Sequence, residues 1–233
     1  MAKGNRGGKR TNTPTTAQTT QSVNTRTRIN FTALTNQQAS ARRDELDDIY
    51  DPDTIGAIKA YISNAPDAQG YSLSQNMNYK LENGLKLNAT EQFTDRFLQK
   101  GMADLGKDTV LYRGAHEDFL QRLGIKNYQS MSESELKSAL VGAEYQTKSY
   151  TSASYDKSKN PFYTGAYAGG REVEMIIKAP KSTKMVFGAR AQTEIVINKG
   201  TKYRVTDVKY TNRTATPRNS GTKKVVQVEV EVI

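Results

Sequence analysis

The spacing of apolar residues changes once along this chain, near Lys107, and this change limits the folds that the chain can adopt. Before it, apolar residues recur three or four positions apart, as in Ile55, Ile58 and Ile62, which is typical of amphipathic helices. After it, short apolar runs predominate, and the last run (223–233) alternates between polar and apolar residues. Helices first and strands afterwards predict an α+β fold with a mainly antiparallel sheet.

Three helices are expected in the first half, each beginning after a residue that can cap it. The expected caps are Asp53 for a helix through Ile62, Ser72 for a second helix, and Asn88 or Thr90 for a third. In the second half we expect short helices at 116–123 and 133–145, a loop at 185–191, and strands at 109–114, 148–154, 172–178, 193–198, 202–210 and 223–233. The sequence N-S-G at 219–221 predicts the turn of a terminal hairpin.

The net charge of +10 is concentrated at the N-terminus. Residues 1–43 contain eight Lys and Arg and no acidic residue, and the remaining residues contain 26 basic and 24 acidic side chains. Residues 11–27 are rich in Thr, Asn and Gln and have too few apolar side chains to form a core. We therefore expect 1–43 to be a disordered basic tail and 44–233 to be one domain. The tail is either a flexible leader or an arm that binds nucleic acid or a larger assembly, such as a virion.

Composition excludes several classes of site. The chain has no Cys, and His116 is its only histidine, so disulfides, thiol nucleophiles and Cys- or His-rich metal sites are not expected. It contains neither a P-loop nor a dinucleotide-binding glycine motif. It also lacks a long apolar run and a signal peptide, so we expect no membrane span. We expect the protein in the cytoplasm of a host cell, in a virion, or delivered by a dedicated route.

Three short patches in the second half carry residues suited to chemistry. Arg113 ends an apolar run, L-Y-R-G, where its planar guanidinium could bind a phosphate. Ser152 lies in Y-T-S-A-S, which offers small hydroxyl groups along a strand. Gln192 and Glu194 lie two residues apart at the start of an apolar strand, so alternation predicts that they share one face. Each patch alone is more typical of an ordinary surface or sheet residue.

In this order the three patches resemble the Arg, Ser-x-Ser, Glu signature of mono-ADP-ribosyltransferases. The most similar branch contains the clostridial Rho-modifying exoenzymes and the actin-modifying binary toxins, and the resemblance covers about 55–233. Ala153 replaces the middle Thr of that branch's Ser-Thr-Ser, and Y-A-G-G-R (167–171) has one Gly more than its Phe-Ala-Gly-Arg stretch.

The resemblance implies a fold and a reaction. The implied fold is a helical N-terminal layer packed on a split, mainly antiparallel β-sandwich, and the implied reaction transfers ADP-ribose from NAD to a macromolecule and releases nicotinamide, without a metal. Glu194 would face the positive charge that develops on the ribose, Ser152 would orient it, and Arg113 and Arg171 would bind cofactor phosphates. In the family, Gln at the position of Gln192 goes with acceptors other than arginine, and an amide is a poor base for a guanidinium.

Two alternatives differ from transfer to a protein side chain. One is a phage-encoded, virion-associated interaction protein that carries a weak or inactive version of this fold. The other is a transferase that modifies nucleic acid.

Overall fold

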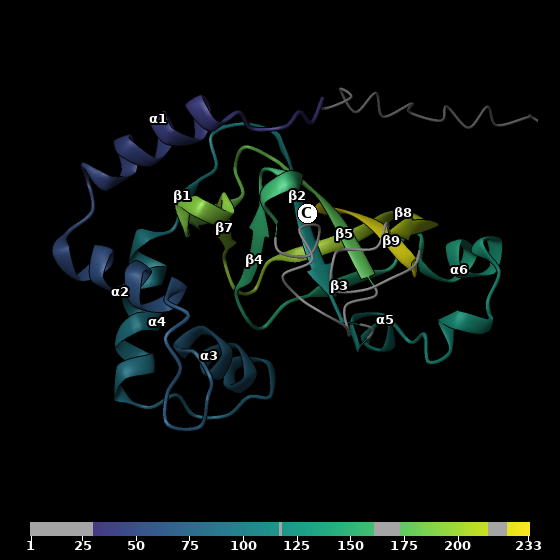
Figure 1. The fold of residues 1–233 in the computed structure, drawn as a ribbon, viewed down its shortest axis with the longest axis horizontal. Coiled ribbons are helices and arrows are strands. Elements are labelled where there is room, and N and C mark those ends of the chain that lie inside the picture. Colours follow the sequence, from purple (N-terminus) through teal and green to yellow (C-terminus); the bar gives the residue numbers. More distant parts are fainter. Residues whose placement is uncertain (1–29, 117, 161–172, 214–222) are drawn as a thin grey trace, which may run out of the picture.

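The computed structural model describes residues 30–116, 118–160, 173–213 and 223–233 (Figure 1). The helices of this part are α1 (Asn36–Asp47), α2 (Pro52–Ile62), α3 (Leu73–Glu82), α4 (Ala89–Gly101), α5 (Asp118–Arg122) and α6 (Glu133–Leu140). The strands are β1 (Ala103–Asp104), β2 (Thr109–Ala115), β3 (Glu144–Gln146), β4 (Thr151–Ser154), β5 (Val173–Ala179), β6 (Lys184–Phe187), β7 (Glu194–Ile197), β8 (Lys202–Arg213) and β9 (Lys223–Val232). No helix in the described ranges combines the length and the apolar character that crossing a membrane requires.

Helices α2, α3 and α4 begin where side chains can satisfy the free amides of a first helical turn. Ser72 and Asn88 cap α3 and α4 as predicted, and each forms a reciprocal capping box. Helix α2 is capped by Asp51 and not by the predicted Asp53. Pro52 explains the earlier start, because proline is favoured at the first helical position, where its missing amide costs nothing.

Helix α1 lies partly within the segment that we expected to be a disordered tail. It is capped by Thr35, and its buried residues are Ala39, Arg43 and Leu46. The structure thus differs from the expected boundary at residue 43, since 36–43 are helical. The buried stripe was hard to recognise because a cation occupies its central position. The remainder of the expected tail, residues 1–29, lies outside the described residues.

The strands form a single sheet in the order β1-β6-β7-β4-β2-β5-β9-β8-β3. All neighbouring pairs are antiparallel except β5 and β9, which are parallel. The pairing between β2 and β4 consists of one residue pair, Tyr112 with Ser154, whereas β2 and β5 pair along seven residues. The sheet is therefore divided at β2 and β4 into two halves, which agrees with the expected split, mainly antiparallel architecture.

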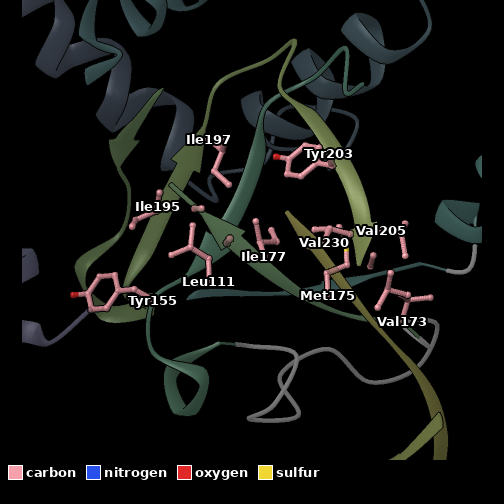
Figure 2. Close-up of a cluster of buried hydrophobic side chains, with 14 of the residues drawn as sticks. Leu111, Tyr155, Val173, Met175, Ile177, Ile195, Ile197, Tyr203, Val205 and Val230 are labelled. Atoms are coloured by element: carbon pink, nitrogen blue, oxygen red, sulfur yellow. The ribbon is translucent and has the colours of Figure 1, made fainter. Parts of the chain in front are cut away.

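The core lies between these two halves. Figure 2 shows side chains from β2, β5, β7, β8 and β9 gathered in one cluster, among them Leu111, Ile177, Ile195 and Val230. Each of these four side chains is fully buried. A second cluster joins α2, α3 and α4 to Tyr150, β6 and β7, and Figure 1 shows these helices toward the opposite end of the sheet from α5 and α6.

Most predicted strands are confirmed, and three strands are additional. Strands β1 and β3 are very short, and the 133–145 helix ends at Leu140, before β3. Strand β6 occupies the start of the expected loop at 185–191. Strands β8 and β9 pair as an antiparallel hairpin, while the predicted turn at 219–221 lies outside the described residues.

Candidate active site

A cavity of about 520 Å³ lies where helices α2 and α3 meet strands β2, β4 and β7. Its walls include Arg113, Ser152, Gln192 and Glu194, so the structure brings together four of the five predicted site residues. The fifth, Arg171, lies outside the described residues. The volume is within the range of about 300–1,000 Å³ typical of small-molecule sites.

Arg113 lies at the line where the sheet divides. It is half-buried on β2, and its Nη1 donates a hydrogen bond of 2.6 Å to the carbonyl oxygen of Ser152 on β4. Arg113 and Gly114 also line a second cavity of about 320 Å³, which extends toward α5 and β3. The guanidinium therefore stands between two adjoining cavities, with its orientation held by a backbone carbonyl.

Gln192 and Glu194 share the cavity for a different reason from the one predicted. Gln192 ends a short 3₁₀ helix, Arg190–Gln192, and only Glu194 belongs to strand β7. Thr193 between them adopts a left-handed conformation (φ 49°, ψ 40°). The side chains converge because the backbone turns at Thr193, and not because two residues alternate along a strand.

Ser154, which was not among the predicted site residues, holds this turn in place. Its hydroxyl is buried and lies 3.0 Å from the carbonyl oxygen of Gln192, 2.8 Å from that of Asp156, and within hydrogen-bonding distance of Thr193 Oγ1. In the β4–β7 pairing Ser154 stands directly opposite Glu194. The two serines of the Ser-x-Ser pattern thus differ: both line the cavity, but Ser152 is half-buried, whereas Ser154 is buried and supports the turn.

The carboxylate of Glu194 is held by backbone rather than by Ser152. Its Oε2 accepts a hydrogen bond of 2.9 Å from the amide of Ala189. Among the hydrogen bonds of the described residues, none joins Ser152 Oγ to Glu194. Gly188 makes this arrangement possible, since a Cβ at that position would lie 2.4 Å from Glu194 Oε2.

Two tyrosines shape the helical side of the cavity: Tyr61 forms part of the wall, and Tyr150 packs against Tyr61. Tyr61 of α2 lines the cavity, and its hydroxyl accepts a hydrogen bond of 2.8 Å from Asn78 Nδ2 of α3. Burial raises the pKa of Tyr61, so its hydroxyl stays protonated. Tyr150 packs edge-on against Tyr61, with ring centroids 5.4 Å apart. No sequence signal distinguished Tyr61 as a cavity wall.

Across the ranges that the structure describes, no group of three or more His, Asp or Glu side chains is arranged to hold a metal ion. The chemistry available at the cavity is that of a guanidinium, a carboxylate, an amide and a hydroxyl.

Several solved structures share this fold. Plx2a, an ADP-ribosyltransferase toxin from Paenibacillus larvae, is 17% identical, with a TM-score of 0.63 over 84% of this chain and 94% of that one. C3stau2 from S. aureus, solved with NAD, is 20% identical, with a TM-score of 0.59 over 88% of this chain and 97% of its own. The enzymatic component C2-I of the Clostridium botulinum C2 toxin is 11% identical, with a TM-score of 0.66 over 85% of this chain and 48% of its own.

Sequence comparison gives the family. No curated protein sequence matches the chain. The family model described as ADP-ribosyltransferase exoenzyme matches residues 35–232. The comparisons support NAD as the co-substrate and a protein as the acceptor, and they give no support to the virion-associated or nucleic-acid-modifying alternatives. The chain belongs to the ADP-ribosyltransferase exoenzyme family and is an NAD-dependent mono-ADP-ribosyltransferase that acts on a protein acceptor.

Proposed function

We propose that the chain transfers ADP-ribose to a protein side chain other than arginine, and that Arg113, Ser152, Gln192 and Glu194 carry the reaction. The observation that supports this proposal is the convergence of these four side chains on one cavity. A guanidinium suited to phosphate and a carboxylate suited to a developing cation line the same space, and these are groups that could bind and cleave NAD.

Glu194 is proposed as the residue that stabilises the transition state. Bound NAD supplies a nicotinamide that leaves as a neutral group, so the bond to ribose breaks without a general acid. The carboxylate of Glu194 opposes the positive charge that develops on the ribose, as carboxylates do in glycoside hydrolysis. Because its Oε2 already accepts from the amide of Ala189, the carboxylate is oriented before the reaction begins.

Arg113 and Ser152 are proposed to hold the substrate. The Arg113 guanidinium is anchored at Nη1 by the carbonyl of Ser152, and its remaining N–H groups can bind a phosphate. The Ser152 hydroxyl lines the cavity and can donate to the carboxylate of Glu194 or to the ribose. Arg171 stays a proposed second phosphate ligand on the strength of the family resemblance alone.

Gln192 is proposed to select the acceptor. It is half-buried on the same cavity as Glu194, at the end of the short 3₁₀ helix that precedes β7. Its amide can both donate to and accept from an acceptor side chain, such as another amide, but it cannot remove a proton from a guanidinium.

The proposed function is tested by incubating the protein with NAD labelled in its adenylate part and with a cell lysate. We expect labelled proteins whose modified residue, mapped by tandem mass spectrometry, is not arginine. Glu194→Gln should lower both nicotinamide release and label transfer by about 10²-fold or more, because the charge opposite the ribose is lost. Gln192→Glu should retain nicotinamide release. Label transfer that survives Glu194→Gln would refute the assignment, and modification of arginine would refute the proposed acceptor.

A further inference from the structure

Arg43 of helix α1 is a buried cation that the proposed chemistry does not use. The residue is 9% exposed, and burial, followed by the nearby charge of Arg190, lowers its pKa. Its Nη1 donates a hydrogen bond of 2.8 Å to the carbonyl oxygen of Gly188, and its guanidinium lies over the ring of Phe187, 5.0 Å from the centroid. Both contacts reach the turn that leads to Glu194.

The contact with Gly188 bears directly on Glu194. The carbonyl of Gly188 and the amide of Ala189 belong to one planar peptide group, so fixing the direction of one fixes the direction of the other. Arg43 binds the carbonyl, and the amide on the opposite side of the same group donates to Glu194 Oε2 at 2.9 Å. A cation at the carbonyl also polarises the peptide and strengthens the hydrogen bond that its amide donates.

Backbone hydrogen bonds within the turn hold the 188–189 peptide group in place, so another amide cannot readily replace it as the donor to Glu194. The amide of Gly188 donates to the carbonyl of Glu194 at 2.9 Å, and the amide of Glu194 donates to the carbonyl of Ala189 at 3.1 Å. The carboxylate lies so close to Gly188 that a Cβ there would overlap it. A rotation of the 188–189 peptide would therefore remove the amide from the carboxylate.

We propose that Arg43 is a positioning residue for the transfer reaction, acting through the 188–189 peptide group to hold the Glu194 carboxylate in its reactive orientation. This inference rests on the role proposed for Glu194. A second link from α1, the pair of Arg190 with Asp44 at 3.3 Å, is exposed on both sides and contributes little by comparison. The helix thus controls the catalytic turn mainly through one buried side chain.

Arg43→Met and Arg42→Met form a matched pair for testing the proposal. Both remove a cation from α1, but Arg42 donates to the carbonyl of Asp104 and pairs with Glu45, away from the turn. Methionine is flexible enough to fill the volume of the arginine stem, and it leaves no unpaired charge at the buried position. We expect Arg43→Met to lower kcat for nicotinamide release about tenfold or more, with the KM for NAD changed less than threefold. Arg42→Met should change kcat less than twofold.

Two further measurements separate positioning from general destabilisation. Thermal unfolding midpoints should show that both variants are folded at the assay temperature. Hydrogen exchange, followed by mass spectrometry of peptides that span the turn, should be faster at 188–194 in Arg43→Met than in Arg42→Met, with β5 unchanged in both. Arg43→Lys retains the charge without the planar fork, so its kcat should lie between those of the wild type and Arg43→Met.

Glu194→Gln serves as the reference that separates the two proposals. If Glu194→Gln is inactive while Arg43→Met has the kcat of Arg42→Met, the positioning role is overturned and the proposed function stands. If Glu194→Gln remains active, the role of Glu194 is overturned, and faster exchange at 188–194 alone then reports whether Arg43 orders the turn. Should Arg43→Met fail to fold, Arg43→Lys decides: a kcat equal to that of the wild type would overturn the proposal.

Discussion

Thr193 is the residue at which the turn at 188–194 stores conformational energy. It is the one residue other than glycine with positive φ in the described ranges, and this conformation costs roughly 1–3 kcal/mol for a β-carbon-bearing residue. Its hydroxyl is buried against that of Ser154 and against the carbonyl of Gln192. These contacts hold the strained geometry, which aims Gln192 and Glu194 into one cavity.

Gly188 should tolerate no side chain. In Gly188→Ala, the new Cβ would lie 2.4 Å from Glu194 Oε2, so the carboxylate must move away from the amide of Ala189. Because a displacement of about 1 Å in a catalytic group can cost on the order of 10² in rate, we expect a loss of that size in nicotinamide release. The measurement is kcat for NAD hydrolysis, with the thermal midpoint recorded alongside.

Gly56→Ala is the matched control for Gly188→Ala. Gly56 is exposed on helix α2, and a Cβ there would meet no heavy atom within 4 Å. Alanine in a helix interior is favoured over glycine by about 1 kcal/mol, so this variant should unfold at a higher temperature and keep its activity. Equal activity in the two alanine variants would contradict the proposed contact between Gly188 and Glu194.

Sequence could predict those site residues whose chemistry resides in their own side chains. Arg113, Ser152, Gln192 and Glu194 were predicted, and they line one cavity. Ser154 and Gly188 could not be assigned in this way, because they act by supporting backbone. Arg43 lies 145 residues from its partner Gly188, and nothing local to α1 indicates that a turn so distant in sequence will contact it.

Elements were predictable where local signals agreed with the final packing. Capping residues and helical spacing identified α3 and α4, and alternation identified β9, because these elements bury the faces that their sequences offer. Helix α1 was missed because its buried stripe contains a cation, and β6 because four residues beside a glycine are as typical of a loop as of a strand.

The cap of helix α2 should make stability depend on pH below about 4. A hydrogen bond from Lys100 and the amide of Thr54 lower the pKa of Asp51 to about 2, below the value of about 3.9 for the unfolded chain. The folded state therefore gains from ionised Asp51 above pH 4 and loses this gain as the pH falls through 2. Asp51→Asn keeps a capping side chain without the charge, so its thermal midpoint should lie below that of the wild type at pH 6 and approach it near pH 2.

Asp53→Asn is the control for the pH dependence. It removes a carboxylate from the first turn of the same helix without removing the pair between Asp51 and Lys100. The difference between the midpoints of this variant and the wild type should change less with pH. A constant difference between Asp51→Asn and the wild type from pH 6 to 2 would contradict the assignment.

At the scale of the whole molecule, helix α1 is continuous with the family domain. The family match starts at residue 35, and both Leu34, just before α1, and Leu46, near the end of α1, are buried in the main core. Helix α1 therefore belongs to the folded domain, and the basic residues at 42 and 43 are part of it rather than of a tail.

Two truncations test this boundary. Deleting residues 1–29 leaves α1 and the whole family match in place, so we expect NAD hydrolysis within about twofold of the full chain and the same unfolding midpoint. Deleting residues 1–47 removes Leu34, Arg43 and Leu46 and should lower both the midpoint and the activity. Full activity in the longer truncation would show that α1 is dispensable.

Because β2 and β4 pair through a single residue pair, Arg113 also has a structural role in the sheet. A sheet normally satisfies its carbonyl groups with amides of the neighbouring strand, but here a guanidinium supplies the donor for the carbonyl of Ser152. Arg113 thus supplies a side-chain hydrogen bond where the backbone pairing between β2 and β4 is interrupted. This interruption leaves room for the proposed substrate between the two halves of the sheet. Removing Arg113 would leave a backbone acceptor unsatisfied and would also remove the proposed phosphate ligand, so the architecture and the proposed chemistry of the cleft depend on the same guanidinium.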